Sequence, residues 1–577
     1  MNVYKKIWAT LDKKSQVKIK ILFFLMIFSM IAETLSIGLI LPVIGLIVDP
    51  NFLNKFQSNI NFILDLKNME YTGLLVFVLS LLVISFILKN LYLVFFYWCQ
   101  YSTVYSIQRS ISKKLLFNYL NRPYTFHIQK NSAQLIRNTT TEVAQLTLAL
   151  TSAITFITEF LVVFGIIILL ILIDPITAVI AAIIFSVIGM IFQKLTRNQI
   201  LKWGKNRHAY EGKRIQDLQQ GLGGIKEVKL YGRETYFMNS YDKNNLGLTK
   251  MIRNQKFMNQ LPRVLVEIIA ILIFILMIAA VLHTGNEINT IIPTLGLFGA
   301  SATRLIPSIN RIMAAAQNLR FSGPVVDVIY SELDSVRSNQ ILDKKDGLND
   351  VKLEFLNSIK INNLSYKYPK AESDVLTNIN ITIKHGDCIG IVGASGEGKS
   401  TLVDLLTGLL PPKSGSIELD EVNIYENLRD YQNIIGYVSQ NIYLLDSSIK
   451  NNIAFGFNKN DINLKLIESV LKKVELFDFI NALPDNIETN IGERGVKLSG
   501  GQRQRIGIAR ALYSNPDIII FDEATSALDN ETENKIMHSV NKLKRDKTIL
   551  IISHRHNALD FCDQIYSIED KSIKKIK

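Results

Sequence analysis

The sequence is poor in cysteine, and its three cysteines, Cys99, Cys388 and Cys562, lie far apart. Metal sites and disulfide frameworks place cysteines at short, recurring spacings. Their absence excludes both classes of site, and we expect the three thiols to behave as small hydrophobic side chains. Cys388 and Cys562 fall in the half of the chain that we place in the cytosol, where thiols stay reduced.

The sequence also lacks a compact basic cluster interleaved with aromatic residues, although its net charge is +13. The positive charge is instead distributed unevenly along the sequence. The N-terminal stretch MNVYKKIWATLDKKSQVKIK is rich in lysine, whereas the segments that we expect outside the cell (49–70, around Asp174 and around Glu287) hold few basic residues. This distribution is the positive-inside bias of membrane proteins, so we expect a cytoplasmic N-terminus and no nucleic-acid partner.

Long hydrophobic runs dominate the first half of the 577 residues. A hydrophobic content of 48% and a mean hydropathy of +0.20 are too apolar for a soluble protein and too polar for a membrane bundle alone. A bilayer is crossed by about 20 apolar residues. We therefore predict an all-α transmembrane domain over 1–337, with six helices centred on 21–48, 72–98, 154–173, 176–192, 264–282 and 291–312. The first run is too long for a cleaved signal peptide.

The connections between these runs are uneven. Asp174 and Pro175 predict a tight turn outside the membrane, whereas the second and third runs, and the fourth and fifth, are joined by long, polar, helix-compatible stretches. Each long stretch is broken near its middle, at 121–131 and 220–234, where we predict short helices across the tips of the bundle; two ordinary surface loops are the alternative. The segment 50–67 has apolar residues at helical spacing and fits an interfacial helix or a packed loop equally well.

After a polar linker at 338–351 the pattern becomes α/β. The sequence HGDCIGIVGASGEGKSTLVDLL reads as strand, glycine loop and helix, and PDIIIFDEATSALD contains a fully apolar strand that ends in two acids. Such runs are typical of buried parallel strands, so we predict an α/β nucleotide-binding domain over 352–577.

The stretch GASGEGKS (393–400) fits the pattern G-x-x-x-x-G-K-[ST] in the required strand–loop–helix context. Glycines let backbone N–H groups surround phosphate oxygens, the lysine neutralises phosphate charge, and the serine hydroxyl can hold Mg²⁺. The sequence therefore predicts ATP and Mg²⁺ as ligands. The expected nucleotide-binding residues of this loop are Gly393, Ser395, Gly396, Gly398, Lys399, Ser400 and Thr401.

The strand IIIFDE (518–523) supplies acidic groups for the same chemistry. Asp522 can hold Mg²⁺, directly or through water, and Glu523 beside it can act as general base on the attacking water. An apolar strand that ends in Asp-Glu is unremarkable alone, but about 120 residues after a phosphate-binding loop it predicts a hydrolytic site.

The stretch LSGGQRQR (498–505) resembles the signature of the ATP-binding cassette (ABC) family, and the resemblance spans essentially all of 352–577. It implies that Ser499, Gly500, Gly501 and Gln502 contact the ATP held by a second cassette. It further implies that Tyr368 stacks on adenine, that Gln440 meets Mg²⁺ and the transmembrane tips, that Asp529 acts across the cassette interface, and that His554 holds the γ-phosphate and water. Glu397 departs from the small residue common in the family.

Each motif occurs once, yet such a site needs a phosphate-binding loop and a signature from different cassettes. We therefore expect the chain to pair, preferably with a second copy of itself; a heterodimer with a degenerate partner is the alternative. Six membrane helices ahead of one cassette resemble the exporter-type half-transporters and imply a multi-pass protein of the bacterial inner membrane with a cytoplasmic ATPase domain.

Basic residues within the apolar runs predict the substrate. Each charge at bilayer depth costs at least about 2.5–3.5 kcal/mol, so something must offset it. If Lys89, Arg263, Arg304 and Arg311 line a central cavity, they suit phosphate or pyrophosphate on a lipid. The alternative is internal pairing, of Arg263 with Glu267 and of the others with Glu33 or Glu159.

The stretches LPRVLVE, TRLIPSINRI and GIKEVKLYGRE resemble the PglK-type flippases of lipid-linked oligosaccharides. The resemblance implies ATP-driven flipping of a polyprenyl-pyrophosphate glycan. Export of another amphiphile (a lipid A precursor, a drug or a peptide) is the first alternative. An ATPase that gates a partner without moving a substrate is the second.

Overall fold

The structure is a computed structural model that describes residues 3–49, 71–284, 288–343, 353–369, 371–524, 529–553 and 559–577. The chain forms two compact units, which are treated separately. The first comprises Met1–Arg122 and Gln129–Ile341, and the second comprises Pro123–Ile128 and Leu342–Lys577. The division after Ile341 lies inside the predicted linker 338–351.

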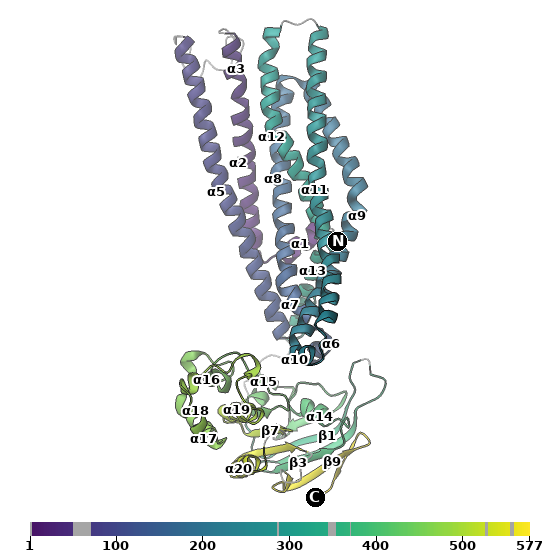
Figure 1. The fold of residues 1–577 in the computed structure, drawn as a ribbon, viewed down its shortest axis with the longest axis vertical. Coiled ribbons are helices and arrows are strands. Elements are labelled where there is room, and N and C mark those ends of the chain that lie inside the picture. Colours follow the sequence, from purple (N-terminus) through teal and green to yellow (C-terminus); the bar gives the residue numbers. More distant parts are fainter. Residues whose placement is uncertain are drawn as a thin grey trace. The chain divides into compact units, whose positions relative to one another are not determined.

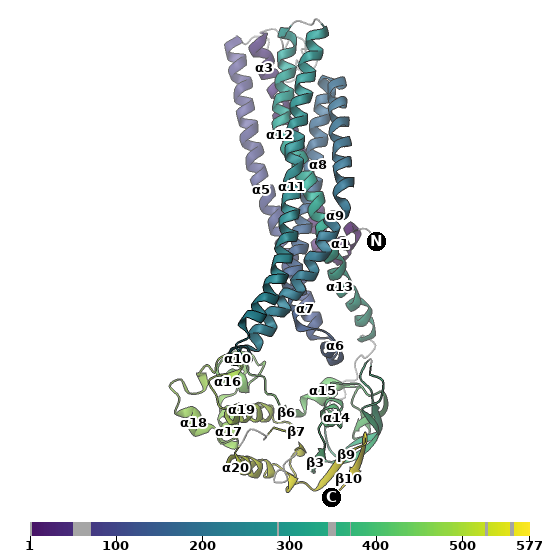
Figure 2. The same cartoon turned by 45° about the vertical axis from the view of Figure 1, so that its right-hand side comes forward.

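The first unit is an elongated bundle of helices (Figures 1 and 2). Long helices run side by side, and many of their apolar residues remain exposed on the outside of the bundle. The helices of this unit are α1 (Val3–Thr10), α2 (Lys13–Gly38), α3 (Ile40–Val48), α5 (Tyr71–Leu120), α7 (Ser132–Arg137), η3 (Asn138–Glu142), α8 (Val143–Ile173), α9 (Pro175–Gly223), α10 (Ile225–Leu230), α11 (Glu234–Thr284), α12 (Ile288–Phe321) and α13 (Gly323–Asp343).

Among the described residues, five helical segments are long and apolar enough to cross a membrane: Lys13–Val48, Tyr71–Leu120, Ser132–Ile173, Pro175–Gly223 and Glu234–Ile275. They contain the first five predicted spans, apart from the end of the fifth. The sixth predicted span, 291–312, is helical within α12 but is less apolar than these five, because Arg304 and Arg311 fall inside it. The segment 50–67, with its predicted interfacial helix or loop, lies outside the described residues.

The predicted turn and breaks have clear local causes. The turn between α8 and α9 is confirmed: Asp174 caps α9 by accepting hydrogen bonds from the N–H (3.3 Å) and hydroxyl (2.7 Å) of Thr177, and Pro175 starts the helix. Proline is favoured there because its missing N–H needs no partner. Short helices occur at both predicted breaks, α6 (Tyr124–Gln129) in 121–131 and α10 in 220–234.

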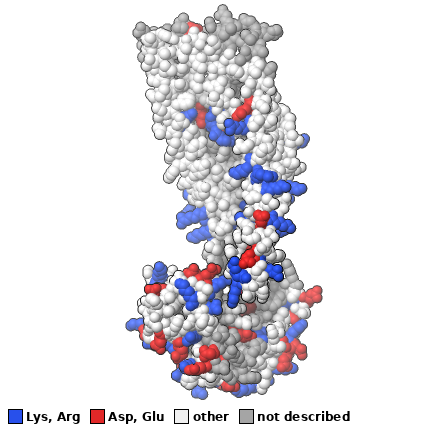
Figure 3. Space-filling view, viewed as in Figure 1, with Lys and Arg blue, Asp and Glu red and all other residues white. Residues whose placement is uncertain are grey.

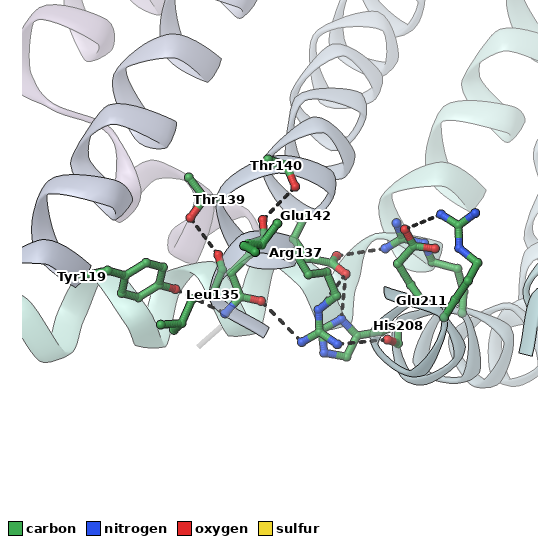
Figure 4. Close-up of polar contacts among 12 residues, drawn as sticks. Tyr119, Leu135, Arg137, Thr139, Thr140, Glu142, His208 and Glu211 are labelled. Atoms are coloured by element: carbon green, nitrogen blue, oxygen red, sulfur yellow. Dashed lines mark hydrogen bonds and ion pairs between the residues drawn. The ribbon is translucent and has the colours of Figure 1, made fainter. Parts of the chain in front are cut away.

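A buried charge network links the segment directly before α8 to α9 (Figure 4). Glu142, at the end of the π-helical turn η3, is fully buried and accepts a hydrogen bond from Arg207 (2.9 Å). It also lies 3.6 Å from Arg137 Nε and 3.1 Å from His208 Nδ1. Gly212 lets α9 approach, since an added Cβ would lie 2.2 Å from Arg137 Nη1. A buried carboxylate surrounded by cations in this way rigidly joins the two helices.

The second unit contains two sheets. A four-stranded antiparallel sheet has the order β2-β1-β4-β5, and a six-stranded sheet has the order β10-β9-β3-β8-β7-β6. In the second sheet β9, β3, β8, β7 and β6 run parallel, which confirms the α/β prediction. The strands are β1 (Ser358–Tyr366), β2 (Leu376–Lys384), β3 (Cys388–Gly393), β4 (Ser414–Leu419), β5 (Val422–Asn423), β6 (Ile435–Val438), β7 (Ile518–Asp522), β8 (Thr548–Ile552), β9 (Gln564–Glu569) and β10 (Ser572–Lys575).

Both faces of the parallel sheet are covered. Ile518 and Ile520 of β7 belong to one hydrophobic core, whereas Ile519 and Phe521 belong to the other, so the strand is apolar up to its last residue, Asp522. The helices of this unit are α14 (Lys399–Leu406), α15 (Leu428–Asn433), α16 (Ile449–Ile453), η4 (Lys459–Asp461), α17 (Leu464–Lys473), α18 (Phe477–Asn481), η5 (Asn486–Glu488), η6 (Glu493–Gly495), α19 (Gly500–Tyr513) and α20 (Asn530–Asn541).

All three cysteines are free thiols. Cys388 and Cys562 are buried in one core of the second unit with their Sγ atoms 3.6 Å apart. Cys99 is partly buried. The expectation of small apolar thiols therefore holds for the first two.

Candidate functional site

The parallel sheet gathers the predicted ATP-site residues at one edge. The phosphate-binding loop follows β3, Glu523 follows β7, and Gln440 comes shortly after β6. Because parallel strands present their carboxyl ends together, ligands bind along that edge. His554, which follows β8, lies outside the described residues.

The loop between β3 and α14 is shaped to surround an anion. Gly396 and Gly398 have φ values of 91° and 98°. This left-handed backbone conformation is unfavourable for residues that carry a Cβ atom. Lys399 is 7% exposed, and its Nζ donates to the carbonyl oxygens of Gly393 and Ala394, both at 2.8 Å. The ammonium group is thus held over the loop, where phosphate oxygens would enter. Loop and lysine fit a nucleotide polyphosphate.

Glu397 folds back onto the same loop. Its Oε2 accepts a hydrogen bond from the backbone N–H of Ala394 (3.2 Å). A carboxylate here adds negative charge close to the position expected for phosphate, and it engages one N–H of the loop. We therefore expect Glu397 to compete with the nucleotide for this part of the loop.

We expect Glu397→Ser to bind ATP about three- to tenfold more tightly than the wild type. The variant removes one charge and one competing hydrogen bond, with a combined net effect of about 1 kcal/mol. Equilibrium titration with a fluorescent ATP analogue measures the change. Glu397→Asp is the matched control for charge, since its shorter side chain keeps the carboxylate but not the 3.2 Å contact. Equal affinity in all three proteins would contradict the competition.

The acidic groups lie at the same edge of the sheet as the phosphate-binding loop. Gln440 donates to Oε2 of Glu523 (2.7 Å), so the two predicted catalytic residues meet. Glu523 has a φ of 49°, an uncommon value for a side chain of this size, and its N–H donates to the carbonyl of Ile552 in β8 (3.0 Å). This backbone turn directs Glu523 away from the strand path. Tyr437 in β6 donates to Oδ2 of Asp522 (3.1 Å).

The electrostatics of this edge favour a cation. Burial raises the pKa of Asp522, the hydrogen bond from Tyr437 opposes that shift, and the charge of Glu523 adds to it. Burial, with the charge of Asp522, raises the pKa of Asp404 on α14 to about 6. A divalent metal would relieve the repulsion among these carboxylates. Carboxylate and hydroxyl oxygens, as in Asp522 and Ser400, are the ligands that Mg²⁺ prefers.

Sequence reasoning missed Tyr437 and Asp404. Asp404 follows Ser400 by four residues, which places both on one face of α14, so helical spacing could have indicated it. Tyr437 precedes the predicted Gln440 by three residues, but only the pairing of β6 with β7 brings it to Asp522.

The signature residues begin α19. Ser499 accepts from the N–H of Gln502 (3.2 Å), and Gln502 Oε1 accepts from the N–H of Ser499 (2.9 Å), which forms a capping box. The N–H groups of Gly500 and Gly501 lie in the first helical turn, where a helix favours anions. Figures 1 and 2 place α19 with α16, α17 and α18, apart from α14.

The other predicted ATP-site residues also have defined partners. The Tyr368 hydroxyl lies 3.1 Å from the Thr401 hydroxyl, so this ring stands beside the first turn of α14. Ser395 is exposed at the tip of the loop. Asp529 caps α20 by accepting two hydrogen bonds from Thr532, which lower the pKa of the Asp529 carboxyl.

The predicted cations of the first unit are not free. Arg304 Nε lies 3.0 Å from Oε2 of Glu33, and its Nη1 lies 3.3 Å from Oε2 of Glu159. Lys89 lies 3.9 Å from the same Glu33 oxygen, and Arg311 Nε lies 2.8 Å from Oε1 of Glu159. Both carboxylates are buried, with side chains 4% and 5% exposed. In Figure 3 a small group of acidic and basic side chains interrupts the otherwise uncharged upper part of this bundle, and further basic side chains lie lower on it.

All four predicted cavity cations thus have carboxylate partners, as the internal-pairing alternative predicts. Arg263 also pairs, with Glu267 at 2.9 Å. The physical reason is the desolvation cost of a lone guanidinium, which an adjacent carboxylate reduces. Lys89 and Arg304 are held among the helices, whereas Arg263 and Arg311 are 67% and 44% exposed.

Arg263 and Arg311 line a pocket of about 610 Å³ between α11 and α12. Arg253 and Lys256, which sequence reasoning missed, add two further cations, and no carboxylate lines the pocket among the described residues. Arg253 and Lys256 could have been found from helical spacing, because positions 253, 256, 260 and 263 lie on one face of α11. Three amides also line the pocket: Asn259, Gln260 and Asn310.

Two family models match this chain. The model of the ABC transporter transmembrane region matches residues 22–299, and the ABC transporter model matches residues 376–526, together well over half of the chain. The chain belongs to the ABC transporters. The order of its two domains and its fold make it an exporter-type half-transporter, which agrees with the sequence prediction.

Curated proteins similar to this ABC transporter include three named "ATP-dependent lipid A-core flippase". Those of Alkalilimnicola ehrlichii and Francisella tularensis subsp. holarctica are 30% and 32% identical over 64% and 66% of this chain. The aligned regions span 62% and 61% of those proteins, less than two thirds of their length. The protein of Pseudoalteromonas translucida is 28% identical over 92% of this chain and 91% of its own length. None of the three is named as a PglK-type flippase.

A solved structure of a bacterial Atm1-family ABC exporter with ATP bound has the same fold. It superposes with a TM-score of 0.77 over 97% of this chain and 95% of that chain, at 20% sequence identity. The predicted fold class, a helical transmembrane domain followed by an α/β ATPase domain, is confirmed. So is the prediction of a multi-pass inner-membrane protein with a cytoplasmic ATPase domain.

Proposed function

We propose that this ABC transporter uses ATP to flip an amphiphilic lipid with an anionic headgroup across the bacterial inner membrane, as a homodimer. The observation that carries the proposal is the pocket between α11 and α12, which is lined by four cations and, among the described residues, by no carboxylate; Arg263 and Arg311 have carboxylate partners outside the lining, and Arg253 and Lys256 add two further positive charges. Apolar surface on the surrounding helices suits lipid chains, and the pocket suits phosphate. The names of the lipid A-core flippase relatives support the same substrate class.

The charge balance of the membrane unit supports an anionic substrate. Three buried or half-buried cations, Lys89, Arg304 and Arg311, share two carboxylates, so the cluster carries an excess positive charge. Arg253 and Lys256 add to it at the cytoplasmic side. A substrate phosphate in the pocket would neutralise the positive charge that the protein's own carboxylates leave unbalanced.

Two kinds of glycolipid fit this chemistry. A lipid A-core type of phospholipid is favoured, because all three reported relatives carry that name. A polyprenyl-pyrophosphate oligosaccharide is the second candidate, favoured by the short motifs around Arg263 and Arg304 and by the bidentate grip that arginine offers to pyrophosphate. We therefore place a lipid A-core type of lipid first and the polyprenyl-pyrophosphate oligosaccharide second, which reverses the order of preference that the short sequence motifs favour.

The ATPase part of the proposal assigns roles to the residues at the sheet edge. Glu523 acts as general base on water, Gln440 and His554 orient the water and γ-phosphate, and the loop from Gly393 to Thr401 binds the phosphates. Bound Mg²⁺, held by Ser400, Asp522 and Gln440, would neutralise phosphate charge. Since Ser499 and Gly501 would contact the ATP of another cassette, the working unit contains a second copy of the chain.

Reconstitution tests the substrate. The purified chain in proteoliposomes is assayed for ATP turnover and lipid movement with a lipid A-core glycolipid, a polyprenyl-pyrophosphate oligosaccharide and a neutral hydrophobic drug. We expect movement of an anionic glycolipid and stimulation of turnover by it. Drug stimulation without a glycolipid response would reject the substrate class, and turnover without movement of any compound would favour a regulator.

The double variant Arg253→Gln, Lys256→Gln tests the pocket. We expect it to lose about tenfold or more of the glycolipid movement, since about 1.5–3 kcal/mol is typical of each charged contact. Lys250→Gln is the matched control, because Lys250 is an exposed lysine on α11 that does not line the pocket. If both proteins move the glycolipid alike, the headgroup is bound elsewhere.

A further inference from the structure

A second cavity of the membrane unit lies on a different face of α12. It has a volume of about 710 Å³ and lies among α8, α9 and α12. On α9 its lining runs from Ala178 to Leu201, which corresponds to about 35 Å of helix at about 1.5 Å per residue. The hydrocarbon core of a bilayer is about 30 Å thick. If α9 crosses the membrane as predicted, the cavity is a groove along that helix, long enough to span the hydrocarbon core.

The groove exists because α9 presents small residues to it. Ala178, Ala181, Ala182 and Gly189 line it at helical spacing, and a Cβ added at Gly189 would meet no heavy atom within 4 Å. The facing wall on α8 includes Phe156 and Phe160, whose rings are stacked with centroids 6.4 Å apart. Leucine, isoleucine and methionine side chains of α12 complete it. These walls suit a hydrocarbon chain.

One end of the groove is basic. Arg197 on α9 and Arg320 on α12 line it at the end nearest the cytoplasm, because both helices run from outside to inside. Arg320 donates to the backbone carbonyl of Gln193 (3.0 Å) and to its side-chain oxygen. Arg197 is exposed, one helical turn beyond Gln193. No Asp or Glu lines the groove among the described residues.

We propose that this groove binds an anionic phospholipid of the cytoplasmic leaflet, with an acyl chain against α8, α9 and α12 and its phosphate at Arg197 and Arg320. The charge at the inner end matches a headgroup phosphate, and the apolar length above it matches a chain that enters the bilayer. The site is distinct from the pocket between α11 and α12, so the proposal goes beyond the transported substrate.

The test is photo-labelling of the full chain in nanodiscs without ATP, using phosphatidylglycerol that carries a diazirine in one acyl chain. We expect labelled peptides from residues 185–201 and 305–320 in preference to those of α5. Gly189→Phe should lower this labelling at least fivefold, because its ring fills the groove. Gly73→Phe is the matched control, since a Cβ there also meets open space but Gly73 lies on α5, outside the groove.

The headgroup is tested with Arg197→Gln against Lys194→Gln, an exposed neighbour on α9 that does not line the groove. We expect Arg197→Gln, and not the control, to reduce the preference for labelled phosphatidylglycerol over phosphatidylcholine by about threefold or more. Uniform labelling around the bundle, or equal labelling of the Gly189 and Gly73 variants, would overturn the proposal. The assay needs no transport, so its result is independent of the proposed substrate.

Discussion

Replacing Glu523 with glutamine will lower ATP turnover by about 10²–10³-fold and leave ATP binding intact. A positioned general base contributes typically 10²–10⁴-fold, and glutamine cannot accept the proton of the attacking water. The replacement keeps the shape of the side chain and an oxygen that can accept the hydrogen bond from Gln440, now at 2.7 Å. Phosphate release and nucleotide titration on the purified protein in lipid measure the two quantities.

The matched control is Glu531→Gln. Glu531 is an exposed carboxylate on α20 that pairs with Lys535 four residues on (2.8 Å), so its loss should leave turnover unchanged. Because ATP remains bound without being hydrolysed, the Glu523 variant should also accumulate as an ATP-bound dimer. Turnover within a few-fold of the wild type would remove Glu523 as the base and would direct attention to another group at the same edge, such as Asp404.

The phosphate-binding loop and the α/β fold of the second unit could be predicted because both depend on local sequence patterns. A phosphate-binding loop needs glycines at fixed offsets, and Gly396 and Gly398 indeed have left-handed backbones. Asp522 and Glu523 end an apolar strand that must be buried and parallel. Gln440, by contrast, could be linked to Glu523 only through family resemblance, since 83 residues separate them and β6 pairs with β7 only in the folded sheet.

The membrane unit shows where prediction from sequence stops. The apolar runs located the spans, but partners of buried charges depend on which helix faces meet. Arg304 is 271 residues from Glu33 and 145 from Glu159, so no spacing rule selects these partners over a phosphate. Glu397 illustrates the same limit on a smaller scale, because its position in the loop was visible whereas its return to the N–H of Ala394 was not.

Replacing Arg304 with alanine will destabilise the membrane unit by about 3–5 kcal/mol, the typical cost of removing one partner from a buried ion pair. The side chain is 17% exposed and contacts two carboxylates, Glu33 and Glu159, which are almost fully buried. Its Nη1 also donates to the hydroxyl of Ser308 (2.9 Å). Without it, the one ion pair left to Glu33 among the described residues is that with the ammonium of Lys89, at 3.9 Å. Thermal unfolding of the purified protein in detergent measures the loss.

Arg263→Ala provides the comparison, because the same change then breaks an exposed pair. Arg263 and Glu267 are 67% and 49% exposed, and such pairs contribute about 0–1 kcal/mol. A second variant separates charge from packing: Arg304→Met with Glu33→Gln fills the space and removes one charge of each sign, while Glu159 keeps its contact with Arg311 (2.8 Å), so it should regain most of the stability lost in Arg304→Ala. If Arg304→Ala unfolds at the same temperature as Arg263→Ala, the carboxylates are not buried against Arg304 in the membrane. The arginine would then be available to a substrate phosphate.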